Sequence, residues 1–136
     1  YLDTYRQTQS GLTVSFHYDG DISRVSRPIA LFCYRMVQEG LTNIARHAQA
    51  HTVTIGLHVL PSKLTLSVRD DGIGFSANRA ERARLNNHLG LVSMRERADV
   101  LNGTFAIDSH PGEGTTLTIS LPLYLSEEEE HEHSLG

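Results

Sequence analysis

The feature that most constrains the fold is a pair of alternating runs, residues 52–60 and 64–69, separated by a three-residue turn. In both runs valine, isoleucine or leucine occupies every second position, and polar residues or glycine fill most of the positions between. This period of two is typical of strands with one buried face. Since the turn begins at Pro61 and is too short for a crossover, the two runs are expected to pair as an antiparallel hairpin.

Three further stretches carry the strand signature. Residues 12–18 alternate between apolar and polar side chains and are followed by an Asp-Gly-Asp turn. Residues 117–121 alternate in the same way just before Pro122. Phe105 and Ile107 are the apolar positions of another strand.

Two stretches carry helical spacing. Residues 28–48 predict a long helix, because Pro28 suits a first helical turn and apolar residues recur every three or four positions. Its apolar face is expected to comprise Ala30, Tyr34, Val37, Leu41, Ile44, Ala45 and Ala48. Residues 91–101 predict a second helix, with Gly103 placed to end it. The apolar face of that helix is expected to comprise Leu91, Met94, Ala98 and Leu101.

The order of these elements is strand, helix, two strands, helix, two strands. Short turns between consecutive strands exclude a wholly parallel sheet, so the pattern predicts a mixed, largely antiparallel sheet with helices on one face. This is a two-layer α/β (α+β) sandwich, and residues 1–125 are expected to form it as one domain. The polar stretch 76–88 has no clear periodicity and is expected to be a lid, and the acidic tail 126–136 is expected to be disordered.

Composition and motifs exclude several classes of function. The chain has 12 basic and 16 acidic residues, and five of the acidic ones lie in the last ten positions, so the body is nearly neutral and a nucleic-acid partner is not expected. No apolar run is long enough for a membrane span, so no membrane contact by this chain is expected. Lys63, the only lysine, follows no glycine-rich run, which excludes a P-loop ATPase. Cys33 is the only cysteine, and zinc-binding spacings are absent.

Four chemically active residue types fall on one side of the first predicted helix. Glu39, Asn43 and His47 are spaced four apart, and Arg46 lies three after Asn43. A carboxylate can orient or deprotonate an attacking group, an amide oxygen suits Mg²⁺, and the two basic groups can donate to phosphate oxygens. A solvated helix face is the alternative interpretation.

Three glycine-containing stretches could complete such a site. Asp70 ends a predicted strand and could accept a hydrogen bond from an exocyclic amine such as that of adenine, with Gly72 and Gly74 allowing close approach. Gly90 opens the second helix, where a phosphate could bind. Residues 112–116 precede the last strand and could bond a ligand through their hydroxyls. Taken singly, the three also fit an ordinary turn, a helix start and a hairpin loop.

Together, in this order and spacing, the stretches resemble the nucleotide-binding boxes of the gyrase, chaperone, histidine kinase and mismatch-repair ATPase superfamily. Residues 38–48 resemble its N box, 70–74 its first glycine box, 90–97 its second and 111–116 its last. The resemblance covers about residues 11–123. The Met-Arg-Glu-Arg and Asn-Ile-Ala-Arg-His-Ala motifs are similar to those of the nitrate-sensor-type bacterial histidine kinases.

The resemblance implies a Bergerat ATP-binding fold and a role for each matching residue. Glu39 would be the general base and Asn43 the Mg²⁺ ligand. Asp70 would hold the adenine amine, Gly90 would approach the phosphates, and Thr116 would support the adenine side. The remaining positions implied to contact ATP are Arg46, His47, Gly72, Ile73, Gly74 and Leu91.

The function implied is that of the ATP- and Mg²⁺-binding catalytic domain of a two-component sensor histidine kinase. The γ-phosphoryl group would pass to a histidine on an upstream dimerisation domain absent from this chain, so the fragment alone would not autophosphorylate. The implied partners are that domain and a response regulator, in the cytoplasm, with a parent protein that is free or membrane-anchored. An anti-sigma-type serine kinase and a non-catalytic nucleotide-sensing module are the alternatives.

Overall fold

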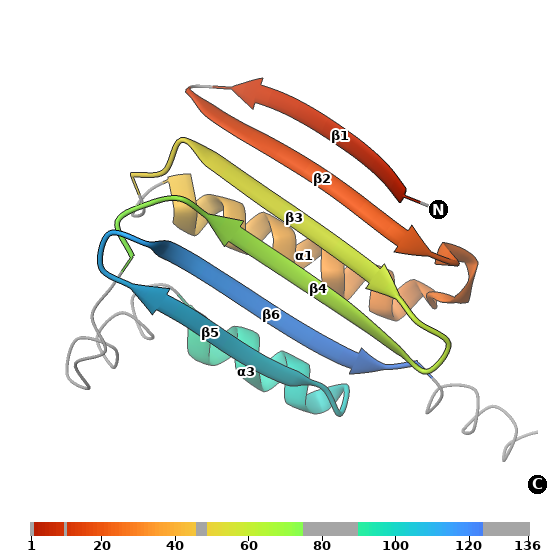
Figure 1. The fold of residues 1–136 in the computed structure, drawn as a ribbon. Helices are drawn as coiled ribbons and strands as arrows, with labels where there is room; N and C mark the ends of the chain where they lie inside the picture. The colour runs from red at the N-terminus through yellow and green to blue at the C-terminus, as the bar shows by residue number, and fades with distance from the viewer. Residues whose placement is uncertain (1, 10, 46–48, 75–89, 124–136) are drawn as a thin grey trace, which may run out of the picture.

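A computed structural model describes residues 2–9, 11–45, 49–74 and 90–123, with side chains from Gly11 onward. It is a two-layer sandwich in which a six-stranded sheet, ordered β1-β2-β3-β4-β6-β5, carries its helices on one face (Figure 1). The strands are β1 Leu2–Gln9, β2 Leu12–Gly20, β3 Thr52–Val59, β4 Lys63–Asp70, β5 Thr104–His110 and β6 Gly114–Pro122. The helices are α1 Arg27–Asn43, α3 Leu91–Val100 and a short 3₁₀ turn, η1 Ile22–Arg24.

The sheet is mixed and largely antiparallel, which confirms the predicted fold class. The predicted hairpin is the β3–β4 pair, and β1–β2 and β5–β6 are hairpins as well. The β2–β3 pair alone is parallel, and α1 provides its crossover. A parallel pair requires such a long connection, so the topology itself places α1 against the sheet.

The strand β1 was not predicted. It pairs along its whole length with β2, from the Leu2–Asp19 pair to the Gln9–Leu12 pair. Its sequence mixes polar and apolar residues without a clean alternation, which is why the periodicity did not reveal it. An edge strand has only one neighbouring strand. The backbone hydrogen bonds to β2 in this hairpin therefore define β1, although its side-chain pattern does not predict a strand.

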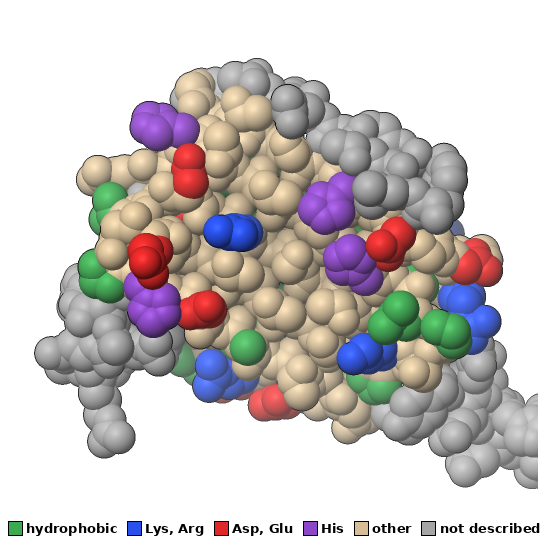
Figure 2. Space-filling model, viewed as in Figure 1, with side chains coloured by type: hydrophobic (Ala, Val, Ile, Leu, Met, Phe, Trp, Pro, Cys, Tyr) green, Lys and Arg blue, Asp and Glu red, His purple; other side chains and the backbone are tan. Residues whose placement is uncertain are grey.

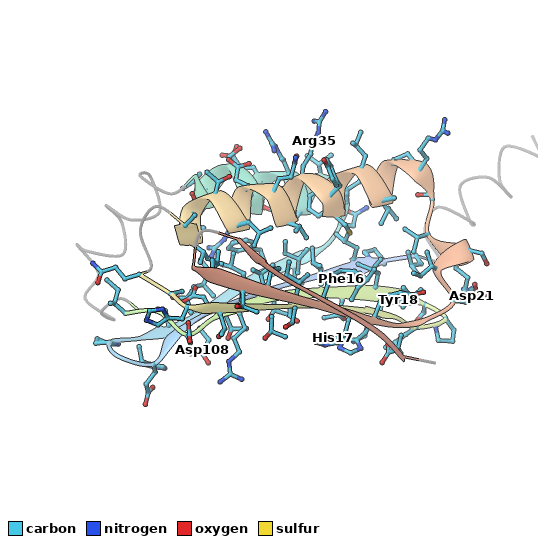
Figure 3. The ribbon with its side chains drawn as sticks, turned by 90° about the horizontal axis from the view of Figure 1, so that it is seen from above. Phe16, His17, Tyr18, Asp21, Arg35 and Asp108 are labelled. Carbon is cyan, nitrogen blue, oxygen red and sulfur yellow. The ribbon has the colours of Figure 1, made fainter. Side chains whose placement is uncertain are left out.

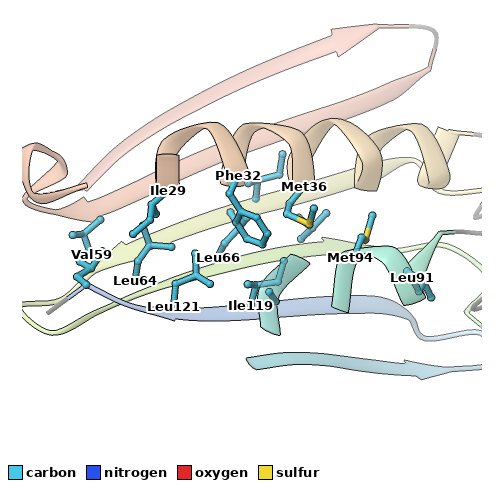
Figure 4. Packing of buried hydrophobic residues seen from close by; sticks show 14 of the residues in the cluster. Ile29, Phe32, Met36, Val59, Leu64, Leu66, Leu91, Met94, Ile119 and Leu121 are labelled. Carbon is cyan, nitrogen blue, oxygen red and sulfur yellow. The ribbon is translucent and has the colours of Figure 1, made fainter. Parts of the chain in front are cut away.

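The buried face of α1 matches the predicted one only in part: Ile44 is buried and Val37 and Leu41 are half-buried against the core, but other predicted members are exposed. Ala30 is exposed and Tyr34 keeps 60% of its surface, so these two members of the expected face point away from the core. The fully buried residues at this face are Ile29, Phe32 and Met36 (Figure 4), together with Gly40 and Ile44. Both stripes have helical spacing, so periodicity could not choose between them. The observed face brings the larger side chains of Phe32 and Met36 into the core.

The end of α1 also differs from the prediction. The α-helix ends at Asn43, and the Ile44 N–H still donates to the carbonyls of Gly40 and Leu41. Ile44 and Ala45 then continue in π-helical conformation. Residues 46–48, which were predicted to be helical, lie outside the described part of the chain.

Gly40 faces the sheet but does not need to be glycine. A Cβ built there would lie 3.6 Å from Val68 Cγ1, which is an ordinary van der Waals contact. We therefore expect Gly40→Ala to raise the free energy of unfolding by about 0.5–1 kcal/mol, because alanine has the higher helix propensity and restricts the unfolded chain. Thermal unfolding should show a midpoint a few degrees higher. Gly103→Ala is the matched control and should lower it, since its Cβ would lie 2.5 Å from the Ser120 carbonyl oxygen.

The helix α3 confirms its predicted face. Leu91, Met94 and Ala98 are buried, and Leu101 is half-buried. The helix ends in a Schellman motif, in which the Gly103 N–H donates to the Ala98 carbonyl at 2.9 Å. The left-handed residue of that motif is Asn102, with a φ of 59°, and not Gly103 as the prediction implied.

The face of the sheet opposite the helices is polar and mostly uncharged. Figure 2 views the molecule from this side, and most of the surface carries neither charged nor apolar side chains. Figure 3, seen from above, shows His17 on this side and both long helices on the other. Within the described residues, neither helix has the length and apolar character needed to cross a bilayer.

Candidate functional site

The predicted site elements gather at one end of the sandwich. The end of α1, the end of β4, the β5–β6 turn and the start of α3 all lie there (Figure 1). Two close approaches connect them: Gly40 of α1 packs over Val68 of β4, and a Cβ on Gly90 would lie 3.4 Å from Glu39 Oε1. The structure therefore brings α1 to β4 and to the start of α3, as a single site requires.

A row of three polar residues closes the inner face of the sheet at this end. Asp70 of β4 pairs with Thr115 of β6, and Thr115 pairs with Ser109 of β5, so the three side chains stand on the same face. The next row inward is entirely apolar, with Val68 opposite Leu117. A polar row at the margin of an apolar face is the arrangement expected where a ligand with both characters binds.

Asp70 is a buried carboxylate with capacity left to bind. Only 5% of its surface is exposed. Its Oδ1 accepts a hydrogen bond from the Gly72 N–H at 2.8 Å, and the carboxylate also accepts from the Thr115 N–H. Burial raises the pKa of Asp70 above its usual value, and these two hydrogen bonds offset part of the rise. A carboxylate has about four acceptor positions, so further positions are available to a donor such as an amine.

The neighbouring Asp71 has a different task. Its Oδ1 accepts hydrogen bonds from the N–H groups of His51 and Thr52, at 2.8 and 2.9 Å, and so fixes the beginning of β3. These hydrogen bonds lower the pKa of Asp71. The two adjacent carboxylates therefore differ in role: Asp70 faces the candidate site, and Asp71 hydrogen-bonds the backbone at the beginning of β3.

The glycines after Asp70 dock that loop on the β5–β6 turn. The Gly112 N–H donates to the Ile73 carbonyl at 2.7 Å. Gly74 has a φ of 66°, and a Cβ there would lie 2.0 Å from the His110 carbonyl oxygen, so no other residue fits without a backbone shift. Gly114 is equally constrained, because its Cβ would lie 2.1 Å from the Asp70 carbonyl oxygen. The first glycine box, residues 70–74, and the last predicted box, residues 111–116, are therefore in direct contact.

Glu39 is held between α1 and α3. Its Oε2 lies 3.8 Å from Arg97 Nη1, and its Oε1 faces Gly90, which has a φ of 70° at the start of α3. Both partners of this ion pair are about half exposed, so the pair contributes little to stability and leaves the carboxylate accessible. The start of α3 also presents backbone N–H groups of the kind that bind phosphate.

The other predicted residues lie as follows. Asn43 is half-buried at the end of α1, one turn beyond Glu39. The Leu91 side chain is buried in the core, so only its backbone could approach a phosphate. Thr116 pairs with Arg69 on the outer face of the sheet, and the structure does not bring its side chain together with that of Asp70. Arg46, His47 and the expected lid 76–88 lie outside the described residues, as does the tail 126–136.

Sequence reasoning missed three contributors to the site, namely Ser109, the Thr115 backbone and Arg97. One signal could have identified the first. Phe105 and Ile107 alternate inward along β5, so Ser109 also falls on an inward position, where a hydroxyl is unusual. Ser109 is indeed buried, with 1% of its surface exposed.

A comparison with protein families gives one match that spans most of the chain. A sequence profile described as "Histidine kinase-, DNA gyrase B-, and HSP90-like ATPase" matches residues 29–125. That range contains α1 from Ile29 onward, the predicted boxes at 70–74, 90–97 and 111–116, and the last strand. It leaves out β1 and β2.

Curated relatives are similar over nearly the whole chain. The signal transduction histidine-protein kinase/phosphatase DegS of Brevibacillus brevis is 32% identical over 127 residues, which are 93% of this chain. The sensor histidine kinase LiaS of Bacillus subtilis is 32% identical over 131 residues, or 96% of this chain. The chain spans only about a third of the length of these relatives, 32% and 34% respectively.

Solved structures share the fold. The blue-light activated histidine kinase of Erythrobacter litoralis EL346 superposes with a TM-score of 0.61 and 24% sequence identity. The match covers 85% of this chain and 36% of that protein.

Proposed function

Because the chain belongs to the histidine kinase-, DNA gyrase B- and HSP90-like ATPase family, we propose that it is the ATP-binding catalytic domain of a sensor histidine kinase. Residues 1–125 constitute that domain. Its role is to bind ATP with Mg²⁺ and deliver the γ-phosphoryl group to a histidine on a dimerisation domain elsewhere in the parent protein.

The observation that carries the proposal is the buried Asp70 at the end of the polar row. Gly72 and Thr115 orient its carboxylate, and burial excludes water that would compete for its remaining acceptor positions. An exocyclic amine is the donor that suits such a site, so Asp70 supports recognition of adenine. Ile73, which is half exposed beside it, offers apolar surface for the base.

The phosphate end of the nucleotide would lie toward the end of α1 and the start of α3. Asn43 offers an amide oxygen for Mg²⁺, and Glu39, one turn earlier, is the proposed general base. Bound Mg²⁺ supplies charge neutralisation on the phosphates. Phosphoryl transfer depends mainly on positioning and electrostatics, and the Glu39 carboxylate lies beside Gly90 at the helix start where phosphate would bind.

The proposed partners follow from the reaction. The phosphoacceptor is the dimerisation domain of the same kinase, and the phosphoryl group then passes to a cognate response regulator. Since Mg²⁺-ATP is the substrate, the domain works in the cytoplasm.

Calorimetric titration of the full chain with ATP tests the binding step. We expect one saturable site, and weaker binding once Mg²⁺ is chelated. Absence of ATP binding in the presence of Mg²⁺ would contradict the proposal.

The chemistry of the product tests the transfer step. The parent kinase incubated with γ-labelled ATP should yield a phosphoprotein that is labile in acid and stable in base, as phosphohistidine is. An acid-stable product would instead indicate a serine kinase that shares this ATP site.

A further inference from the structure

The structure assigns a positioning role to Ser109, a buried residue to which the proposed function gives no role. We propose that Ser109 orients the Thr115 hydroxyl so that this hydroxyl accepts, and does not donate, a hydrogen bond at the base-binding end of the site. Ser109 thereby favours a purine with an amine at position 6 over one with a carbonyl there. This inference rests on the proposed function, since it concerns the base of the nucleotide.

The argument begins with the single proton of the Ser109 hydroxyl. Ser109 Oγ donates to the Gly114 carbonyl oxygen at 3.1 Å, and a carbonyl can only accept. Ser109 Oγ also lies 2.7 Å from Thr115 Oγ1. Either hydroxyl could donate in the shorter contact; we infer that the threonine donates there, because the Gly114 carbonyl can only accept and so uses the serine proton.

This donor assignment determines what the Thr115 hydroxyl can offer to a ligand. Its only hydroxyl proton points toward Ser109, so it offers lone pairs to anything on its other side. Thr115 stands directly opposite Asp70 on the same face of the sheet, and Asp70 is also an acceptor. Two acceptors side by side suit the two hydrogens of an amine and oppose the lone pairs of a carbonyl oxygen.

A purely structural role for Ser109 is the competing explanation. The Ser109–Gly114 bond also ties together the two ends of the β5–β6 turn, because His110 and Gly114 are paired. Loss of that bond would weaken binding of every nucleotide alike. The positioning role differs, because it changes the ratio of affinities for two bases.

The test compares ATP with inosine triphosphate, which carries a carbonyl in place of the amine at position 6. Affinities of the full chain for both nucleotides, with Mg²⁺, are measured by calorimetry or by competition against a fluorescent adenine nucleotide. Ser109→Ala frees the threonine proton to donate to the carbonyl oxygen. We expect the ATP-to-inosine preference to fall by about tenfold, the effect of roughly one hydrogen bond.

The Thr118→Ala variant is the matched control, since Thr118 is a hydroxyl residue of the same strand on the outer face, opposite Ser67. It should leave the preference unchanged. Thr115→Val removes the oriented hydroxyl, and adding Ser109→Ala to it should change the preference no further, because Ser109 acts through Thr115. If Ser109→Ala does not fold, Ser109→Cys keeps a weak donor and should shift the preference in the same direction by less.

The outcomes separate this inference from the proposed function. A wild-type chain that binds neither nucleotide contradicts the proposed function itself. Equal wild-type affinities, or a Ser109→Ala variant that weakens both nucleotides equally, would overturn the positioning role while leaving ATP binding established. A further fall when Ser109→Ala is added to Thr115→Val would overturn it as well.

Discussion

Asp70→Asn is expected to abolish ATP binding and to leave the domain folded. Asparagine keeps one acceptor oxygen, which the Gly72 N–H occupies, and replaces the other oxygen with an amino group. That group would face the adenine amine donor to donor. Sites that pair a buried polar group with the wrong partner lose binding steeply, so we expect at least about a 100-fold loss of affinity in calorimetry.

Although Asp70→Asn should lose ATP affinity, its free energy of unfolding at neutral pH should not fall. Burial raises the pKa of Asp70 above its ordinary value of 3.8, so the folded chain holds its proton more tightly than the unfolded chain. The Asp70 contribution to stability therefore falls as pH rises from 3.8 through the folded pKa, and above that it remains unfavourable. Asp70→Asn removes this contribution, so at neutral pH its unfolding midpoint should equal or exceed that of the wild type.

Asp71→Asn is the matched control, because it makes the same chemical change one residue away at a carboxylate that holds β3. It should retain ATP affinity within a few-fold. Normal ATP binding by Asp70→Asn would show that the adenine contact has been assigned to the wrong residue. Loss of binding in both variants would show that the loss reflects the fold of this loop.

Glu39→Gln is expected to keep ATP binding and to lose phosphoryl transfer. Glutamine preserves the shape beside Gly90, and the proposed contact with the base is made by Asp70 and not by Glu39. It cannot take a proton, and loss of a general base typically costs about 10²–10⁴-fold in rate. The measurement is the initial rate of phosphohistidine formation in the parent kinase, with ATP affinity determined in parallel.

Glu96→Gln is the control for this prediction, since Glu96 is an exposed carboxylate on α3. Its transfer rate should match that of the wild type. A Glu39→Gln kinase with a normal rate would remove Glu39 from the proposed mechanism. A loss of ATP affinity equal to the loss of rate would make Glu39 a binding residue.

The sequence predicted best those parts of the molecule that depend on local pattern. The hairpin of β3 and β4 follows from strict alternation and a short turn, and the buried face of α3 follows from three widely spaced apolar residues. Asp70 and the glycines after it were predicted as site residues because a strand end followed by glycines is a local signal, and the structure buries Asp70 at the end of β4. The close approach of the His110 carbonyl oxygen explains physically why position 74 requires glycine.

The parts that were missed depend on partners distant in the sequence. The helix α1 has two apolar stripes, and only the shape of the sheet decides that Phe32 and not Tyr34 is buried. Thr115 and Thr116 are chemically identical neighbours, and only the register with Asp70 shows which side chain shares its face. The strand β1 is defined by its pairing with β2, which its own composition does not reveal.

The crossover through α1 has a consequence for the size of ligand that the domain can accept. The chain leaves α1 at Asn43 and must reach Thr52, which Asp71 holds in place. In the sheet, Val53 is the partner of Asp70. Asn43 and Asp70, the proposed metal-binding and base-binding residues, therefore belong to elements that pack directly on each other, since Gly40 of α1 lies over Val68 of β4. The separation of the two ends, and with it the length of ligand that can reach both, is set by this packing of helix on sheet.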